Sequence, residues 1–111
     1  MSARILVVDD DETSRRALTR LLASEGHVAH ACASAAEALA QLPGAHYTVL
    51  LTDLVMPEMN GLDLVRAARA IQPELRCLIM SGHARAEGAP SDVEWVTKPI
   101  DIDELLAKLD A

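Results

Sequence analysis

The chain has 111 residues, half of them hydrophobic, which is enough for one domain with a buried core. Its formal net charge of −7 is opposite to that of the Lys and Arg clusters that attract nucleic acids, so we expect no direct binding to DNA or RNA. The chain contains neither an apolar run near the roughly 20 residues of a membrane span nor a signal-peptide cleavage site, so we expect one cytoplasmic domain over 1–111 without membrane contact.

The first third of the chain predicts a strand, an amphipathic helix and a second strand. The apolar run 4–8 indicates a strand that ends at an acidic triplet, 9–11. Helical spacing over about 13–25, ended by Gly26, predicts a helix with Arg15, Arg16 and Arg20 turned away from its apolar face. That face carries Ala17, Leu18, Leu21 and Leu22. The weaker run 27–32 indicates the second strand.

The middle of the chain continues this alternation. Ser and Glu stand three positions apart in 34–37, which is typical of a capping box at the start of a helix. We expect that helix to stop by 42–44, where Pro and Gly interrupt it. The run 49–52 indicates a third strand, and it ends at Asp53.

The last part predicts two more strands and two more helices. A helix is expected over about 62–71, a strand over 77–80 and a short strand over 94–97. Between these strands, 84–92 contains Gly and Pro but no large apolar residue, so we expect a loop there. Asp101 is placed to cap a final helix. The pattern predicts a three-layer α/β sandwich with five parallel strands and helices on both faces.

Chemically active side chains follow four of the expected strands at the same end. They are Asp9, Asp10, Asp53, Ser81 and Lys98. In open α/β sheets this edge is where ligands bind. Neighbouring carboxylates repel one another unless a hard cation takes their oxygens as ligands. The sequence therefore predicts a Mg²⁺ or Mn²⁺ site, and the lysine and hydroxyl suit a phosphoryl group beside it.

Other acids and the two cysteines are interpreted as structural. Asp11 and Asp63 have the ordinary role of helix caps or solvated loop acids. Cys32 and Cys77 lie far apart inside apolar segments, where free cysteines usually behave as small buried hydrophobes.

In this order, the residues resemble the receiver domain of two-component response regulators, from about residue 4 to 109. Each motif is weak alone, but the ordered set is specific. The motifs are Asp9-Asp10, Asp53-Leu54-Val55-Met56-Pro57, Asn60-Gly61, Ser81-Gly82 and Lys98-Pro99. The resemblance implies a flavodoxin-like sheet with strand order 2-1-3-4-5.

The resemblance also implies a function. Asp53 would accept a phosphoryl group from a histidine kinase or histidine phosphotransfer protein in a phosphorelay. Asp10, Asp53 and the backbone carbonyl of Val55 would bind the metal directly, and Asp9 would orient a metal-bound water. The chain would be a stand-alone receiver or the receiver of a hybrid kinase. It would be a signalling domain that assists its own phosphorylation and dephosphorylation, not an enzyme.

Further roles are implied for residues around the phosphoacceptor. Lys98 would contact the phosphoryl group, and Ser81 would move toward it after transfer. The Lys98–Pro99 bond is expected to be cis, which is tolerated only before proline. Val55 and His83 occupy positions from which receivers tune the lifetime of the acyl phosphate. Trp95 occupies the position of a switching aromatic residue, although it could equally be a packing residue.

One segment departs from the family pattern. Ser81 and Lys98 stand 17 positions apart, fewer than in most receivers, so we expect the fourth helix to be shortened or absent. That helix belongs to the surface through which receivers usually pair, which counts against such pairing here. The first helix would be the docking face for a kinase or phosphotransfer helix bundle, through Ala17, Leu18 and Leu21.

Two alternatives remain open at the level of sequence. The segment 5–13 also fits the opening motif of haloacid-dehalogenase-type phosphatases, in which Asp9 would be the nucleophile and Asp11 the acid. The chain could also be a pseudo-receiver, with the fold but without phosphorylation. The position of an acyl phosphate would decide between these interpretations.

Overall fold

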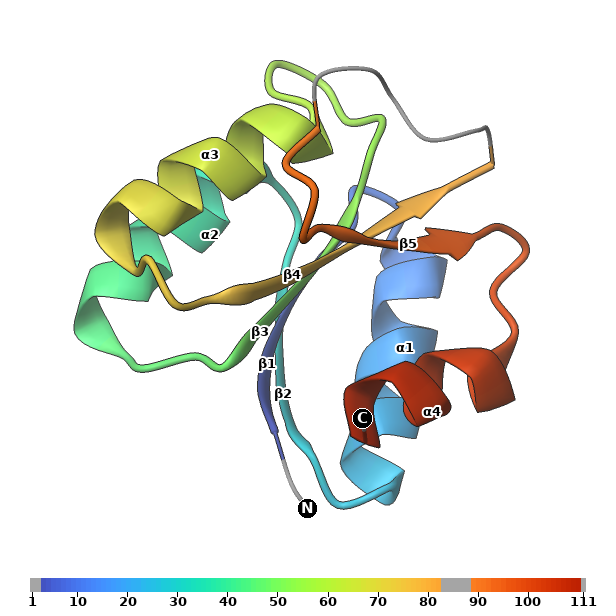
Figure 1. The fold of residues 1–111 in the computed structure, drawn as a ribbon. Helices are drawn as coiled ribbons and strands as arrows, with labels where there is room; N and C mark the ends of the chain where they lie inside the picture. The colour runs from blue at the N-terminus through green and yellow to red at the C-terminus, as the bar shows by residue number, and fades with distance from the viewer. Residues whose placement is uncertain (1–2, 83–88, 111) are drawn as a thin grey trace.

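The computed structural model describes residues 3–82 and 89–110. Figure 1 shows a three-layer α/β sandwich with the sheet between two helical layers. The sheet has the order β2-β1-β3-β4-β5, and every neighbouring pair is parallel. The predicted fold class and strand order are confirmed.

The helices and strands lie within one or two residues of their predicted positions. The strands are β1 Arg4–Val8, β2 Val28–Cys32, β3 Val49–Asp53, β4 Arg76–Ser81 and β5 Glu94–Thr97. The helices are α1 Glu12–Ser24, α2 Ala35–Gln41, α3 Gly61–Ile71 and α4 Ile102–Asp110, with a 3₁₀ turn at Leu42–Gly44. No helix in the described ranges is long and apolar enough to cross a bilayer.

Both faces of the sheet are covered. Helices α2 and α3 lie on one face and α1 and α4 on the other (Figure 1). In β1, Leu6 and Val8 pack in the core under α2 and α3, whereas Ile5 and Val7 pack in the core under α1 and α4. Burial on both sides explains why β1, β3 and β4 are nearly continuous apolar runs, whereas the edge strand β2 is mostly exposed.

The helix ends follow the predicted signals. Gly26 has φ of +90°, and the N–H groups of Gly26 and His27 donate to the carbonyls of Ala23 and Leu22, each at 3.1 Å. This pair of hydrogen bonds is a Schellman motif, which requires a residue in the left-handed conformation, such as Gly26, after the helix. At the start of α4, Asp101 accepts a hydrogen bond from the N–H of Glu104 at 3.2 Å, so the predicted cap is confirmed.

The connection from β4 to β5 is described only in part. Its described residues, 89–93, contain no helix. A turn bond joins the Val93 N–H to the Pro90 carbonyl at 3.2 Å, and Arg69 on α3 pairs with Asp92 at 2.8 Å. Residues 83–88, with the predicted tuning residue His83, lie outside the described residues. The described ranges hold four α-helices, in line with the expected loss or shortening of the usual fourth one.

Candidate functional site

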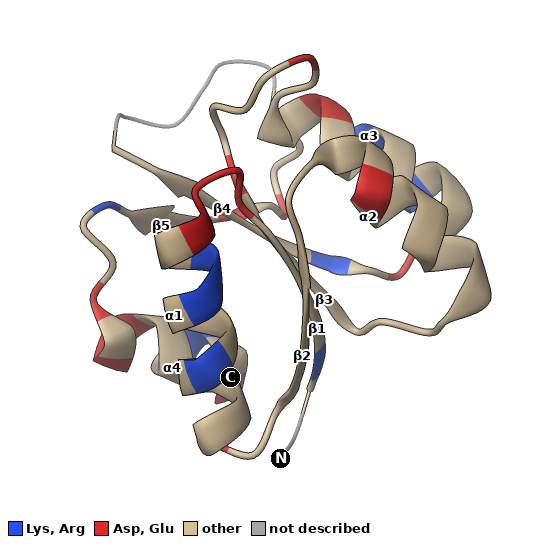
Figure 2. Ribbon diagram, turned by 180° about the vertical axis from the view of Figure 1, so that it is seen from behind, with Lys and Arg blue, Asp and Glu red and all other residues tan. Residues whose placement is uncertain are grey.

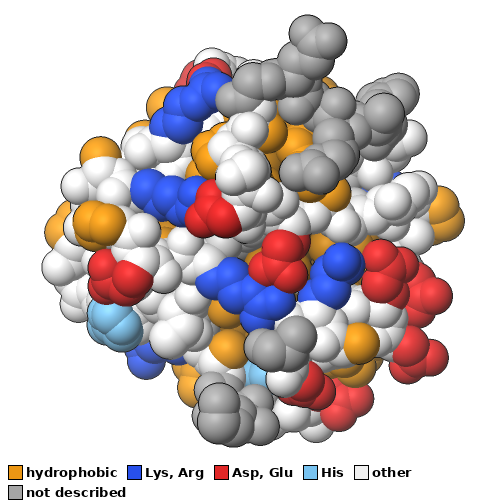
Figure 3. Space-filling model, in the orientation of Figure 1, with side chains coloured by type: hydrophobic (Ala, Val, Ile, Leu, Met, Phe, Trp, Pro, Cys, Tyr) orange, Lys and Arg blue, Asp and Glu red, His pale blue; other side chains and the backbone are white. Residues whose placement is uncertain are grey.

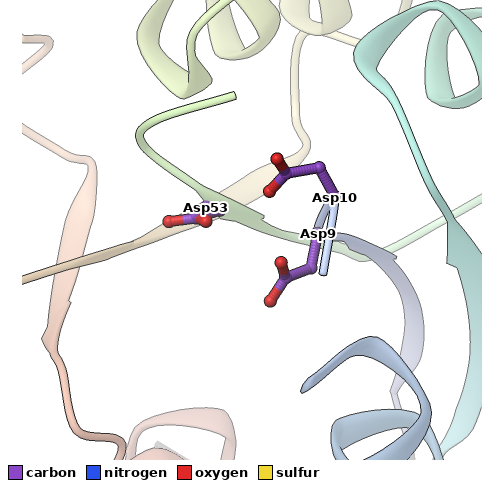
Figure 4. A group of neighbouring side chains, drawn as sticks. All are labelled: Asp9, Asp10 and Asp53. Carbon is purple, nitrogen blue, oxygen red and sulfur yellow. The ribbon is translucent and has the colours of Figure 1, made fainter. Parts of the chain in front are cut away.

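Three carboxylates meet where β1 and β3 end. Asp9 and Asp10 follow β1, and Asp53 is the last residue of β3 (Figure 4). Val8 is paired with Thr52, so the residue after each lies at the same edge of the sheet. One carboxylate oxygen from each aspartate lies within 4.8 Å of the others. The structure thus brings together the three acids that the sequence singled out.

The electrostatics of this cluster favour a bound cation. Asp9 and Asp53 are buried and Asp10 is exposed. Burial raises the pKa of Asp9, and the nearby charges of Asp53 and Asp10 raise it further, against the opposing effects of the Asp11 N–H and of Lys98. Dehydrated anions this close together are unfavourable unless a positive charge compensates them. Three hard oxygen donors fit Mg²⁺ or Mn²⁺.

Lys98 supplies one positive charge to the site. Its Nζ lies 2.9 Å from Oδ1 of Asp53, whose side chain is 11% exposed. The backbone N–H of Lys98 donates to the carbonyl of Ser81 at 2.9 Å, which joins the ends of β5 and β4. The bond from Lys98 to Pro99 is cis. Ser81 is buried and paired with Thr97, so both residues lie at the same sheet edge as the acids.

The turn between β1 and α1 is held by its own side chains. The N–H of Asp11 donates to Oδ1 of Asp9 at 2.9 Å. Oδ2 of Asp11 accepts from the N–H of Ser14 at 3.2 Å and from its hydroxyl at 2.7 Å. Asp11 is therefore the N-cap of α1, as interpreted from the sequence, and Figure 2 shows the acidic turn leading into this basic helix.

The prediction that Arg15 faces away from the packed side of α1 is wrong. Its side chain is half-buried, and its guanidinium donates to the backbone carbonyl of Asp9 at 2.9 Å. Long helical side chains lean toward the N-terminal end of their helix, and here that direction leads to the end of β1. The only sequence signal for this contact is an arginine six positions after Asp9, which does not by itself specify where the guanidinium lies.

The loop after Asp53 is held close to the site by backbone contacts. The N–H of Leu54 donates to the Met80 carbonyl at 3.0 Å, and the N–H of Gly61 donates to the Leu54 carbonyl at 2.8 Å. A Cβ added at Gly61 would lie 2.5 Å from the carbonyl oxygen of Asp53, which explains the glycine at this position. The Val55 side chain is exposed, and the role of its carbonyl as a metal ligand stays a prediction.

Trp95 has a clear packing role. It is half-buried in β5, beside Ile79 of β4, and packs against the core under α2 and α3. Its buried Nε1 has no hydrogen-bond partner in the described part of the chain. The proposed switching role of Trp95 stays a prediction.

A groove runs from the carboxylate cluster along α1. It has a volume of about 480 Å³ and lies between α1 and the segment 98–102. Its apolar lining residues are Ala17, Leu18, Leu21, Met80, Pro99, Ile100 and Ile102, and Asp9 and Lys98 also line it. The predicted apolar face of α1 is therefore divided. Leu18 and Leu22 are buried, Leu21 is half-buried and Ala17 is exposed.

Comparisons with known proteins agree with this geometry. Residues 5–110 match the family described as the response regulator receiver domain. The chain is 37% identical to the response regulator receiver protein CpdR of Brucella abortus, over 96% of this chain and 93% of that protein. It is 33% identical to the sensor kinase CckA of the same organism, over 94% of this chain but 12% of the kinase. The solved structure of TrrA from Thermotoga maritima in complex with Mg²⁺-BeF has a TM-score of 0.89 at 27% identity, over 97% of this chain and 96% of that one.

Proposed function

This chain belongs to the response regulator receiver domain family of two-component systems, and we propose that Asp53 is its phosphoacceptor. The donor would be a phosphohistidine of a histidine kinase or histidine phosphotransfer protein. The observation that carries this proposal is the setting of Asp53. It is buried at the end of β3, paired with Lys98 at 2.9 Å and within 4.8 Å of oxygens of Asp9 and Asp10.

The transfer follows from the chemistry of these groups. A carboxylate oxygen of Asp53 forms a bond to phosphorus while the bond from phosphorus to the donor histidine nitrogen breaks, and the electron pair of that bond returns to the imidazole. Lys98 exchanges its contact with Asp53 for a phosphoryl oxygen, whose charge it neutralises. Ser81 reaches the same oxygens with its hydroxyl. The product is an acyl phosphate, which water later hydrolyses.

The donor set also suits a divalent cation. Asp10, Asp53 and the Val55 carbonyl would hold Mg²⁺ or Mn²⁺, and Asp9 would hold a water of its coordination shell. When bound, such a cation neutralises the oxygens of a transferring phosphoryl group and of the acids around it.

The groove along α1 is where we propose that the donor protein docks. It is apolar along most of its length and ends at Asp9 and Lys98, so a helix lying in it would bring a phosphohistidine to Asp53. Ala17 is the best position for a test, because it is exposed and lines the groove. Leu18 is buried, and a charge there would also destabilise the packing of α1 against the sheet. Ala17→Arg should slow transfer from the cognate protein and spare a small phosphodonor.

In the cell, this activity would make the chain a cytoplasmic signalling switch in a phosphorelay, not a metabolic enzyme. The chain matches nearly the full length of CpdR but only a small part of the much longer CckA. Both a stand-alone receiver and a hybrid-kinase receiver are therefore compatible with it. We propose no direct contact with nucleic acid. The face in Figure 3 carries basic side chains interspersed with acidic ones, and the net charge is −7.

The decisive experiment is to phosphorylate the protein with a small phosphodonor and Mg²⁺, and to map the acyl phosphate by peptide mass spectrometry. We expect the label on Asp53, with none on the Asp53→Ala variant. Label on Asp9 would support the phosphatase alternative, and a folded protein that takes no label from any donor would support a pseudo-receiver.

A further inference from the structure

The turn that carries the acidic pair is connected to α1 by more than its peptide chain. Asp9 uses Oδ1 to accept the Asp11 N–H, and Asp11 caps the helix through Ser14. The backbone carbonyl of Asp9 accepts a hydrogen bond from the guanidinium of Arg15 at 2.9 Å. The N–H of Arg15 in turn donates to the Asp11 carbonyl at 2.9 Å. Residues of α1 therefore hold the turn both through its side chains and through its backbone.

The Asp9 carbonyl belongs to the peptide unit that precedes Asp10. The planar unit ends at the Cα of Asp10, so once its plane is fixed, the Asp10 side chain can change direction only by rotation about the N–Cα bond. Asp9 is also held on its N–H side, which donates to the Cys32 carbonyl at 3.2 Å. Asp10 is exposed, and no side-chain contact of this residue in the described part of the chain takes over that role.

We propose that Arg15 is a positioning residue for the acidic pair: by holding the Asp9 carbonyl, it sets the carboxylates of Asp9 and Asp10 in place for a divalent cation. This inference rests on the proposed function of the site. Arg15 would touch neither the cation nor the phosphoryl group. Groups that orient metal ligands in this indirect way affect metal affinity substantially.

Arg15 has two opposing effects on cation binding. The sign of the change in metal affinity when Arg15 is replaced therefore tests the inference. The guanidinium is positive, so through space it repels a divalent cation. Replacing Arg15 with a neutral residue would strengthen metal binding if its charge were its only influence. Positioning has the reverse consequence, since a turn that is free to move spreads the ligand oxygens and weakens binding.

The test is direct Mn²⁺ binding, measured by electron paramagnetic resonance of free Mn²⁺, on the whole chain. Arg15→Gln and Arg15→Met both remove the bond to Asp9, and Met keeps the length of the aliphatic stem. We expect each to weaken Mn²⁺ affinity by about tenfold, and Arg15→Lys to recover part of the loss. Arg16→Gln is the matched control. Arg16 is exposed and pairs with Glu12 at 3.7 Å. Arg16→Gln should therefore bind Mn²⁺ with the wild-type affinity.

A second readout separates positioning from general damage. With a small phosphodonor, Arg15→Gln should require more Mg²⁺ for half-maximal phosphorylation and reach the wild-type rate at saturation. Mn²⁺ affinity in folded Arg15→Gln or Arg15→Met that equals or exceeds the wild-type value would overturn the inference. If the wild-type chain bound no Mn²⁺ and took no phosphoryl group, the proposed function would fail first, and this inference with it.

Discussion

Gly61 is the residue at which the structure makes its sharpest prediction. It is the first residue of α3, and a Cβ there would lie 2.5 Å from the carbonyl oxygen of Asp53 and 3.1 Å from Cα of Leu54. Both atoms belong to the backbone, so no side-chain rotation can make room. Gly61→Ala should therefore push the start of α3 and the end of β3 apart. This movement should displace Asp53.

The expected loss of stability follows from two opposing contributions. Overpacking against a rigid neighbour costs about 1–3 kcal/mol. An alanine in place of glycine also restricts the unfolded chain, which stabilises by about 0.4–1 kcal/mol. The net loss in the free energy of unfolding should be about 1–2 kcal/mol. Urea unfolding followed by circular dichroism measures it, as a lower midpoint with an unchanged slope.

The same substitution at Gly44 is the matched control. Gly44 lies in the 3₁₀ turn, and nothing lies within 4 Å of a Cβ built there. Gly44→Ala meets no such contact, so it should keep the wild-type stability or raise it by up to about 1 kcal/mol through the unfolded chain. Gly61→Ala should also take a phosphoryl group from a small phosphodonor more slowly, because its Asp53 is displaced. Wild-type stability and wild-type phosphorylation in Gly61→Ala would refute the close approach of α3 to Asp53.

Two further predictions concern other regions. Burial raises the pKa of the Cys32 and Cys77 thiols to about 11 each. At pH 8 a thiol reagent should therefore label the native protein only as fast as the protein unfolds. Rapid labelling without denaturant would contradict this burial. The hydrogen bonds from Arg76 lower the pKa of Glu94 below its usual 4.5, so their stabilisation is present above pH 4.5 and lost as the pH falls through the lowered value. Glu94→Gln should flatten this acidic decline in unfolding free energy, and an unchanged pH profile would show that the pair contributes nothing.

The fold could be predicted from the sequence because the local signals are strong and agree with one another. Burial on both faces makes β1, β3 and β4 nearly continuous apolar runs, and Gly26 and Asp101 mark helix ends through specific hydrogen bonds. The acids could be placed together for a topological reason. Parallel strands end at one edge, so Asp9 and Asp53 had to be neighbours once β1 and β3 were adjacent.

The contacts of a long side chain, and the need for a glycine at a particular position, could not be predicted in this way. Arg15 can point in many directions, and its contact with the Asp9 carbonyl depends on how α1 leans over the end of β1. The need for a glycine at position 61 depends on a distance between α3 and the backbone of Asp53. Periodicity assigns a residue to a face of a helix, but it does not give distances between elements.

Asp11 shows how local geometry separates two interpretations that share the same motif. In the phosphatase alternative, Asp11 would be the general acid and would have to hold a proton near neutral pH. Instead, the side-chain and backbone hydrogen bonds from Ser14 lower the pKa of Asp11, so it stays ionised. Its carboxylate is also occupied as the cap of α1. An ionised carboxylate that is already occupied at a helix start is poorly placed to act as a general acid, so these contacts favour the proposed phosphoacceptor at Asp53 over a nucleophile at Asp9.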